Sequence, residues 1–202
     1  MTGRLIAFEG IDGSGKSTQV RKLAQHLGCD VTFQFGATAV GNSIRSILLD
    51  PRNEQLDDRT EALLIIADKA QHVREVVRPA LQAGRDLISD RYGASTLAYQ
   101  GYGRGLDLSL LNTMIEFATQ GLQADLTVFL DLDVSTALGR VGNRRDRIED
   151  IGAEFFGRVR DGYRSLAEQH RSSWVTVDAQ GSVDAVAARV QTCVQAWFAE
   201  QQ

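Results

Sequence analysis

The chain has 202 residues, of which 43% are hydrophobic and 24% charged, and its formal net charge at pH 7 is −4. This length suits one buried core, so we expect a single domain over residues 1–202. The acidic balance argues against nonspecific binding to nucleic acid or to an anionic membrane, because either partner would require a basic surface.

The two cysteines, Cys29 and Cys193, lie far apart in the sequence and belong to no C-x-x-C pair or histidine cluster. This spacing argues against a disulfide framework and against a zinc site. No basic segment followed by an apolar stretch occurs near residue 1, and no run of eighteen apolar residues occurs anywhere. We therefore expect reduced thiols in a cytoplasmic protein.

Short apolar runs alternate with longer helical patterns along the chain, which is typical of βαβ units and a parallel sheet. In chain order, the runs predict strands at residues 4–8, 30–35, 86–89, 126–131 and 173–177. Apolar residues at helical spacing predict helices at 16–27, 41–49, 57–83, about 107–122, 134–141, 151–170 and 181–199. Gly28 is expected to cap the first helix. Near the carboxyl edge of the sheet, where open α/β sheets bind ligands, we expect irregular stretches at 35–40, 93–105 and 142–150.

Between the first strand and the first helix, residues 10–17 read G-x-x-x-x-G-K-[ST], a complete phosphate-binding loop. Its glycines allow tight, partly left-handed turns, so that successive N–H groups point into one concavity around phosphates. Lys16 adds a positive charge near the β and γ phosphates, and the Ser17 hydroxyl is placed to bind Mg²⁺. The alternative is a glycine-rich turn that matches by chance. We expect a nucleoside triphosphate to be bound by Gly10, Ile11, Asp12, Gly13, Ser14, Gly15, Lys16, Ser17 and Thr18.

A second motif, Asp90-Arg91-Tyr92, follows the third predicted strand. A carboxylate at the tip of a buried strand beside a phosphate loop is the usual second contributor to Mg²⁺ binding, so Asp90 joins Ser17 as a candidate. Arg91 offers a planar donor fork to an acceptor phosphate. Taken alone, Asp90 and Arg91 could instead form a structural ion pair at the end of the strand.

Three blocks of sequence carry a resemblance to a known family. They read FEGIDGSGKST at 8–18, DRYGASTLAYQG at 90–101 and DRIE at 146–149. In order and spacing they resemble thymidylate kinases, and the likeness spans roughly residues 4–170. The resemblance implies an enzyme that uses ATP and Mg²⁺ to phosphorylate dTMP to dTDP. It also implies a homodimer with the P-loop NTPase fold, a three-layer α/β/α arrangement around a five-stranded parallel sheet of order 2-3-1-4-5.

The resemblance also implies roles for individual residues. Asp12 would bind the sugar 3′-hydroxyl of the acceptor, and Arg91 would bind its phosphate. Lys16 and an arginine from a lid at about 142–150 would neutralise charge on the transferred group, so that positioning rather than covalent chemistry accelerates the reaction. The side chains implied along the sugar and the base, where a tyrosine ring excludes a 2′-hydroxyl, are Ser95, Tyr99 and Gln100.

The remaining catalytic charge is expected in the lid. In one branch of the family an arginine follows the aspartate of the loop, but this chain has Gly13 there. The bacterial branch takes the charge from its lid, where this chain has Arg144, Arg145 and Arg147. A closing basic lid would expel water and strengthen each phosphate contact. The alternative is a solvated charged loop, and the sequence does not decide which arginine reaches the phosphoryl group.

The segment after the second strand departs from the family pattern. Residues 32–38 contain no arginine, although many family members have one there. An acceptor-phosphate ligand is therefore missing, or is replaced by Arg45 in the next helix or by another group. The same segment contains two aromatic residues, Phe33 and Phe35, either of which could supply a face for the base.

The long helix departs from the family at two positions. Alignment puts Ile65 where the family stacks a phenylalanine on thymine, and Lys69 where an arginine reads thymine O4. Isoleucine gives contact area without π stacking, and lysine gives a point charge without a fork. Either Phe33 or Phe35 supplies the aromatic face and thymine is still recognised, or the enzyme prefers a pyrimidine other than thymine. The structural alternatives are an ordinary core residue for Ile65 and a solvated helix face for Lys69.

Other titratable residues carry weaker signals. Asp131 and Asp133 end the fourth strand, and we expect them to cap the following helix rather than to bind a metal. The three histidines are scattered, and phosphoryl transfer of this kind requires none. We expect surface positions for His26, His72 and His170.

Three other functions are alternatives to a thymidylate-type kinase: a related kinase with altered base preference, a nucleotide-dependent switch and a catalytically idle nucleotide-binding homologue. The switch is disfavoured because the run after the third strand, Asp90-Arg91-Tyr92-Gly93, puts an arginine beside the aspartate. The N-x-x-D run at 143–146 also lies about a helix beyond the strand end where a guanine-reading motif belongs. Intact Lys16, Ser17, Asp90 and Arg91 argue against the idle homologue.

Overall fold

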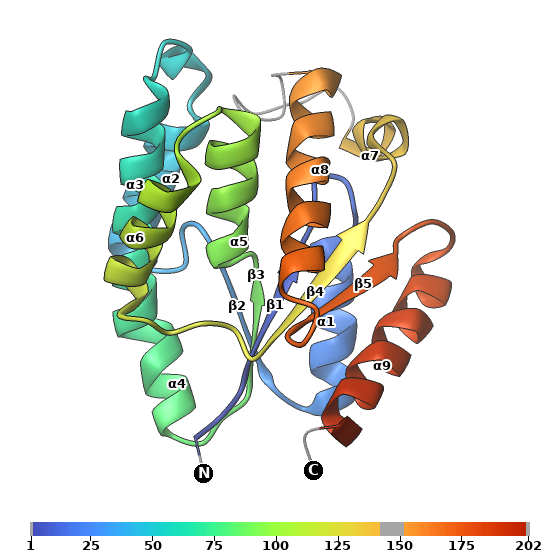
Figure 1. The fold of residues 1–202 in the computed structure, drawn as a ribbon. Helices are drawn as coiled ribbons and strands as arrows, with labels where there is room; N and C mark the ends of the chain where they lie inside the picture. Colours follow the sequence, from blue (N-terminus) through green and yellow to red (C-terminus); the bar gives the residue numbers. More distant parts are fainter. Residues whose placement is uncertain (1, 142–151, 201–202) are drawn as a thin grey trace.

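A computed structural model places a β-sheet between layers of helices (Figure 1) and describes residues 2–141 and 152–200. All strands are parallel, and they lie in the order β2-β3-β1-β4-β5. This confirms the five predicted strands, their order and the three-layer α/β/α fold. The strands are β1 Leu5–Glu9, β2 Asp30–Phe33, β3 Leu87–Asp90, β4 Leu126–Asp131 and β5 Trp174–Asp178.

The helices cover both faces of the sheet. Helix α1 packs against α9, whereas α8 packs against η3, β4 and β5. Segments η2 and η3 are π-helical and η1 is a short 3₁₀-helix. In chain order the helical elements are α1 Lys16–Leu27, α2 Ala39–Leu49, η1 Pro51–Asn53, α3 Asp58–His72, η2 Val73–Val77, α4 Arg78–Gln82, α5 Gly93–Thr96, η3 Leu97–Gly103, α6 Leu108–Thr119, α7 Val134–Val141, α8 Ala153–Gln169 and α9 Val183–Glu200.

Strand β1 lies at the centre of the sheet and is buried along its whole length. Ile6 and Phe8 join a hydrophobic cluster with side chains of α1 and α9. Leu5 and Ala7 join a different cluster with side chains of η2 and α4. Successive strand residues point to opposite faces, so Glu9 shares the face of Leu5 and Ala7. This alternation places a carboxylate beneath α5 and α8.

The long helix predicted at 57–83 is one helical run in three parts, α3, η2 and α4. In its middle, the N–H of Arg78 donates to the carbonyl of Val73, five residues earlier, which widens the turn. Pro79 follows directly, and proline lacks an N–H and crowds the preceding turn. The wider turn at η2 is the usual way in which a helix absorbs such a residue.

Of the stretches expected to be irregular, 93–105 is largely helical, whereas 35–40 is irregular up to Thr38. Helix α2 begins at Ala39, two residues earlier than predicted, because the Thr38 side chain accepts the N–H of Gly41 at 2.9 Å and caps it. Residues 93–103 form α5 and η3, although their glycines suggested a loop. At Gly101 an added Cβ would lie 2.3 Å from Leu108 Cδ2, so the glycine permits close helix packing rather than a turn.

Of the two aspartates at the end of β4, one behaves as expected and the other does not. Asp133 does cap α7, accepting the N–H groups of Ser135 and Thr136. Asp131 instead pairs with Arg160 at 2.6 Å and with Arg164 at 2.8 Å. These arginines come from α8, so their proximity depends on the fold and not on the local sequence.

The expectation that all three histidines lie at the surface was wrong for one of them. His26 and His170 are exposed as predicted, whereas His72 is completely buried. Its ring nitrogens hydrogen-bond Thr32 at 2.7 Å and Gln34 at 2.9 Å. Burial and the nearby Lys69 lower the pKa of His72 to about 4, so the ring is neutral at pH 7. Gly28 caps α1 as predicted, donating its N–H to the Ala24 carbonyl.

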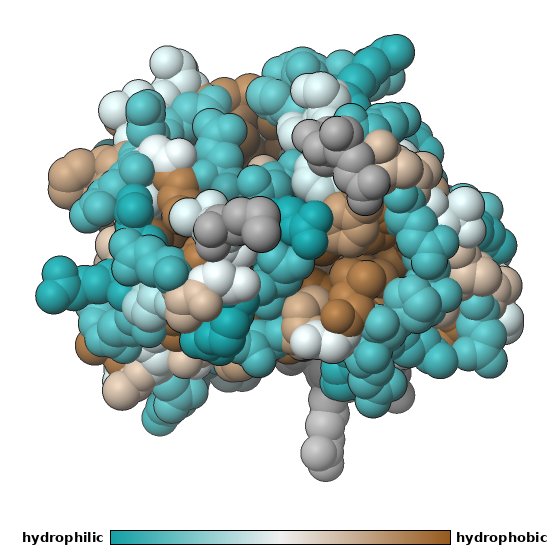
Figure 2. All heavy atoms as spheres, turned by 90° about the horizontal axis from the view of Figure 1, so that it is seen from below, coloured by the Kyte–Doolittle hydropathy of each residue, from teal (hydrophilic) through white to brown (hydrophobic). Residues whose placement is uncertain are grey.

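Both ends of the chain lie at the end of the molecule opposite the carboxyl tips of the strands (Figure 1). Seen from there, the surface is mainly hydrophilic and surrounds a hollow lined by hydrophobic side chains (Figure 2). Among the described residues, no helix is long and apolar enough to cross a membrane. The two sequence motifs meet at the other end, where β1 and β3 finish side by side.

Candidate active site

The phosphate-binding loop turns sharply between β1 and α1. Gly10, Gly13 and Gly15 have φ values of 146°, 80° and 92°, which favour glycine. A Cβ on Gly13 would lie 2.2 Å from the carbonyl oxygen of Ala137 in α7. Helix α7 therefore packs directly on the loop, and no arginine side chain fits at position 13.

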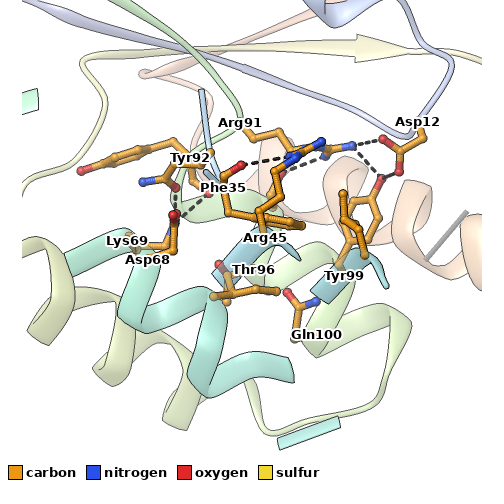
Figure 3. A pocket seen from close by; sticks show the side chains of 14 residues that line it. Asp12, Phe35, Arg45, Asp68, Lys69, Arg91, Tyr92, Thr96, Tyr99 and Gln100 are labelled. Carbon is orange, nitrogen blue, oxygen red and sulfur yellow. Dashed lines mark hydrogen bonds and ion pairs between the residues drawn. The ribbon is translucent and has the colours of Figure 1, made fainter. Parts of the chain in front are cut away.

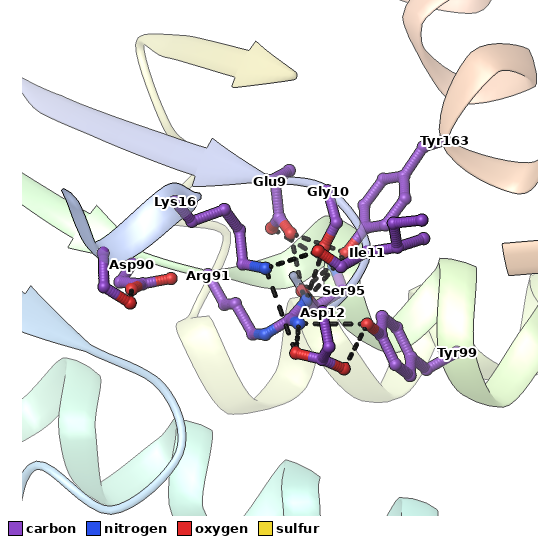
Figure 4. A network of polar contacts seen from close by, with 11 residues as sticks. Glu9, Gly10, Ile11, Asp12, Lys16, Asp90, Arg91, Ser95, Tyr99 and Tyr163 are labelled. Carbon is purple, nitrogen blue, oxygen red and sulfur yellow. Dashed lines mark hydrogen bonds and ion pairs between the residues drawn. The ribbon is translucent and has the colours of Figure 1, made fainter. Parts of the chain in front are cut away.

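Lys16 begins α1 and points back under the loop (Figure 4). Its ammonium donates to the carbonyl of Ile11 at 3.0 Å and lies 4.0 Å from Asp12 Oδ1. The side chain is only 6% exposed. Burial, followed by the charge of Arg91, lowers the pKa of Lys16 to about 8. A buried cation of this kind has a strong electrostatic preference for an anionic ligand.

Ser17 and Asp90 come together as the two motifs predicted. The Ser17 hydroxyl donates to Asp90 Oδ2 at 2.5 Å, joining the start of α1 to the end of β3. Among the described residues there is no group of three or more His, Cys, Asp or Glu side chains that could hold a metal ion. Ser17 and Asp90 thus place a hydroxyl and a carboxylate side by side at the end of β3.

Arg91 has an unusual backbone that turns its side chain over the loop. Its φ is 70°, a left-handed value that is uncommon for residues other than glycine. From this position Nη2 lies 2.5 Å from Asp12 Oδ1 and 3.0 Å from the Tyr99 hydroxyl. Nη1 donates to the Gly10 carbonyl at 3.1 Å. Strained residues of this kind concentrate at functional sites.

Asp12 is ionised in this arrangement. Burial alone would raise its pKa, but the charges of Arg91 and Lys16 dominate and lower the pKa to about 2. Burial holds the pKa of Tyr99 well above its usual value, so its phenol stays neutral and donates to Asp12 Oδ2 at 2.7 Å. Figure 4 shows Asp12 between the Arg91 guanidinium and the Tyr99 ring. The Asp12 carboxylate therefore links the phosphate-binding loop to Arg91 after β3 and to Tyr99 of η3.

Glu9 is a site residue that the sequence reasoning missed. It is completely buried, and its two oxygens accept the N–H groups of Tyr92 and Ser95, the Ser95 hydroxyl and the Tyr163 hydroxyl. Four donors satisfy the buried carboxylate and fix the turn that follows β3. The alternation of β1 could have indicated an inward-facing acid at position 9, but Tyr163 comes from α8 and carried no local signal.

A pocket opens beside the loop, between β3, α3 and η3 (Figure 3). Every residue predicted for the acceptor site lines it. Phe35 does so, whereas Phe33 is 45% exposed elsewhere, so of these two phenylalanines Phe35 is the one available to a ligand. The lining residues are Asp12, Gln34, Phe35, Arg45, Leu49, Ile65, Asp68, Lys69, Arg91, Tyr92, Ser95, Thr96, Tyr99 and Gln100.

Lys69 lies inside the pocket, and a solvated position for it is wrong. It is 1% exposed and donates to Gln34 Oε1 at 2.5 Å and to the Tyr92 carbonyl at 3.1 Å. Burial lowers its pKa to about 8. Gln34, which lies in the arginine-free segment after β2, therefore holds Lys69 through its side-chain oxygen.

Arg45 lies at the same pocket. Its Nη1 donates to the Phe35 carbonyl at 3.0 Å, and its guanidinium carbon lies 5.3 Å from the centre of the Phe35 ring. These two contacts hold the Arg45 guanidinium against Phe35, within the segment 32–38 that contains no arginine. Ile65 is also buried at the pocket and packs with Phe35, so it is both a core residue and a lining residue.

Thr96 is one of the lining residues that the sequence did not indicate. Its hydroxyl is buried and has no hydrogen-bond partner within the described part of the chain. The three lid arginines predicted at Arg144, Arg145 and Arg147 lie outside the described residues. The structure therefore brings together the loop, Asp90, Arg91 and the acceptor candidates, and the lid stays a prediction.

The thymidylate kinase family model matches residues 8–190, which is most of the chain and includes every motif above. The chain belongs to the thymidylate kinase family. A thymidylate kinase of Synechococcus sp. (strain CC9605) is 46% identical, with 96% of this chain and 98% of that protein aligned. One from Solidesulfovibrio magneticus is 46% identical over 92% of this chain and 95% of its own.

A solved structure gives the same answer for the fold. The crystal structure of thymidylate kinase from Ehrlichia chaffeensis superposes with a TM-score of 0.81 at 28% identity, covering 96% of this chain and all of that one. Membership confirms the resemblance predicted from the sequence, the P-loop fold and the nucleoside monophosphate kinase class. The family reaction is phosphorylation of dTMP to dTDP, with ATP as phosphoryl donor.

Proposed function

We propose that this chain transfers the γ-phosphoryl group of ATP to dTMP at the point where the loop meets the pocket. One observation carries the proposal. Arg91 is bonded to the loop through Gly10 and Asp12, and it also lines the pocket. A phosphate held by Arg91 therefore lies next to the loop that holds the donor, which is the arrangement that in-line transfer requires.

On the donor side, the loop N–H groups and Lys16 would bind the triphosphate. The positive end of α1 lies under the same position and favours anions. In the free protein the Lys16 ammonium is held by Ile11 and Asp12. Contact with the phosphates would replace these interactions and raise the pKa of Lys16 again, because an added negative charge favours the charged amine.

Mg²⁺ fits the oxygen donors beside the loop. Ser17 and Asp90 place a hydroxyl and a carboxylate within 2.5 Å of each other, and Mg²⁺ prefers one or two such ligands together with phosphate oxygens and water. Bound there with ATP, the ion would neutralise charge on the phosphates. Ser17 and Asp90 are the residues that would hold it.

On the acceptor side, Arg91 and Arg45 would bind the monophosphate, with Arg45 in place of the arginine absent from 32–38. Asp12 would accept the sugar 3′-hydroxyl, and the Tyr99 ring, with Ser95 beside it, would exclude a 2′-hydroxyl. Both Asp12 and Tyr99 line the pocket and are fixed to Arg91, so sugar and phosphate contacts form one unit.

The base would lie deeper in the pocket. Phe35 offers an aromatic face and Ile65 packs beside it. Lys69 and Gln100 present the polar groups that read the edge of the base. The lysine uses two of its three donor positions on Gln34 and Tyr92, which leaves one for a carbonyl oxygen such as thymine O4.

The remaining proposals concern the lid and the assembly. The charge that Gly13 cannot supply would come from Arg144, Arg145 and Arg147, which follow α7. A homodimer in the cytoplasm would form through helices. Its proposed surface is where α3 packs against α6, since Leu63 and Phe117 there are 57% and 82% exposed.

The decisive test is a coupled assay of ADP release with ATP and each of dTMP, dUMP, dCMP and dGMP. We expect turnover with dTMP and far less with the purine nucleotide. If none of the four monophosphates stimulates ADP release, the chain is not a nucleoside monophosphate kinase of this type. Turnover that favours another pyrimidine would move the proposal to a related kinase with altered base preference.

A further inference from the structure

Glu61 of α3 forms a buried contact with Gln100 of η3. Only 1% of Glu61 and 2% of Gln100 are exposed, and Gln100 Nε2 donates to Glu61 Oε1 at 3.0 Å. Arg104 donates to the same carboxylate through Nη2 at 2.9 Å and Nε at 3.2 Å. These charge-assisted bonds stabilise the ionised form of Glu61.

An ionised carboxylate can only accept hydrogen bonds, and this fixes the direction of the neighbouring amide. Gln100 must turn its NH₂ group toward Glu61, which leaves Oε1 on the other side. Gln100 lines the pocket, and its oxygen has no hydrogen-bond partner among the described residues. Figure 3 shows the Gln100 amide at the pocket beside Thr96, whose buried hydroxyl is also without a partner in that part of the chain. The pocket therefore offers an acceptor at Gln100.

At Lys69 the pocket offers a hydrogen-bond donor instead of an acceptor. Its ammonium has donors only, and Gln34 accepts one of them because the Gln34 NH₂ group is engaged with His72 Nδ1. A ligand in the pocket thus meets a donor at Lys69 and an acceptor at Gln100. A 4-oxo pyrimidine matches this pattern with its O4 carbonyl and its N3–H. A 4-amino pyrimidine reverses both positions, with an NH₂ group and an unprotonated N3.

We infer that Glu61 is a positioning residue that sets the base preference of the acceptor site, by holding the Gln100 oxygen toward N3–H. This inference rests on the proposed acceptor pocket. Glu61 touches no substrate itself and acts through Gln100. A site built around a hydrogen bond rejects the mismatched partner strongly, because its buried polar group is left unpaired.

The test compares dTMP with 5-methyl-dCMP, which differ only at C4 and N3, using the 202-residue chain. We expect the ratio of kcat/KM for dTMP over 5-methyl-dCMP to fall by about tenfold or more in Glu61→Gln, because one unpaired polar group accounts for that factor. The amide introduced by Glu61→Gln can donate a hydrogen bond as well as accept one. The side-chain amide of Gln100 is then free to turn over, with its NH₂ group toward the base. The matched control is Asp58→Asn, which removes the 3.2 Å contact of Asp58 with Arg104 and leaves the Glu61–Gln100 bond. Its ratio should not change.

The double variant Glu61→Gln, Gln100→Glu provides a rescue. Its carboxylate at position 100 accepts from both glutamine 61 and the base, so the preference for dTMP should return. An unchanged ratio in a folded Glu61→Gln protein would overturn the inference. If that variant does not fold, loss of the dTMP preference in the double variant would do the same. A native protein that phosphorylates neither compound would refute the proposed function and this inference with it, whereas normal dTMP turnover with an unchanged ratio refutes only the inference.

Discussion

Arg91 Nη2 lies 2.5 Å from Asp12 Oδ1, and this ion pair joins the turn after β3 to the interior of the phosphate-binding loop. The two residues are separated by 79 positions in the chain and are brought together because β1 and β3 are neighbours in the sheet. Both line the acceptor pocket. The donor loop and the acceptor site are thereby held in one fixed relation.

Replacing Arg91 with lysine should lower kcat/KM for dTMP by about 10²-fold or more, since small misplacement of a reacting group has that effect. Lysine keeps a positive charge but cannot reach Asp12, Tyr99 and the Gly10 carbonyl together. Steady-state kinetics with varied dTMP measures the change. The control is Arg85→Lys, because Arg85 pairs with Asp30 at the far end of the sheet. A folded Arg91→Lys protein with native kcat/KM would remove Arg91 from the acceptor site.

Lys16 gives a prediction about pH. Burial and Arg91 lower its pKa to about 8 in the free protein, so the ammonium is present below that pH and is lost as pH rises through it. Because kcat/KM reports the free enzyme, its value for ATP should fall above about pH 8, whereas kcat should stay level to higher pH.

The control for this pH prediction is Lys69→Met, which removes the second lysine of pKa about 8 and should leave the fall in kcat/KM for ATP in place. Lys16→Ala should abolish turnover at every pH. Near-native turnover of that variant would exclude Lys16 from phosphoryl transfer.

Removing the three lid arginines together should lower kcat by about 10³-fold or more, the range known for an arginine that stabilises the transferred phosphoryl group. The variant is Arg144→Ala, Arg145→Ala, Arg147→Ala. Its control is Arg171→Ala, which lies just beyond the C-terminal end of α8. Single-turnover and steady-state rates separate chemistry from binding. A change confined to KM would indicate that the arginines only bind substrate.

Gly13 should tolerate no side chain. Gly13→Ala places a Cβ 2.2 Å from the Ala137 carbonyl at a left-handed φ of 80°, and we expect a loss of about 2–4 kcal/mol in the free energy of unfolding. The matched control is Gly15→Ala, where φ is 92° and no atom lies within 4 Å of the added Cβ. It should lose only about 1–2 kcal/mol. Equal losses in urea unfolding would show that packing on α7 is unimportant.

Local patterns were sufficient for much of the fold and for the central part of the site. The strands are short apolar runs, and the loop and the Asp90-Arg91 pair are continuous motifs, so their chemistry can be read without distant partners. The pattern misled where glycines at 101 and 103 suggested a loop. There the missing side chains make room for Leu108 and Phe155, and only packing against those residues makes the segment helical.

The sequence by itself determined the alternation of strands and helices and the identity of the residues at the phosphate loop, because these depend on spacing within a few turns of chain. The family and the strand order came from the resemblance of three separate motifs to thymidylate kinases. Only the tertiary structure decided that Glu9 is satisfied by Tyr163, that Lys69 is buried against Gln34 and that Glu61 orients Gln100. Each of those pairs lies 35 or more positions apart. Hydrogen-bond direction and burial are properties of such pairs, and they exist only after the strands and helices have packed.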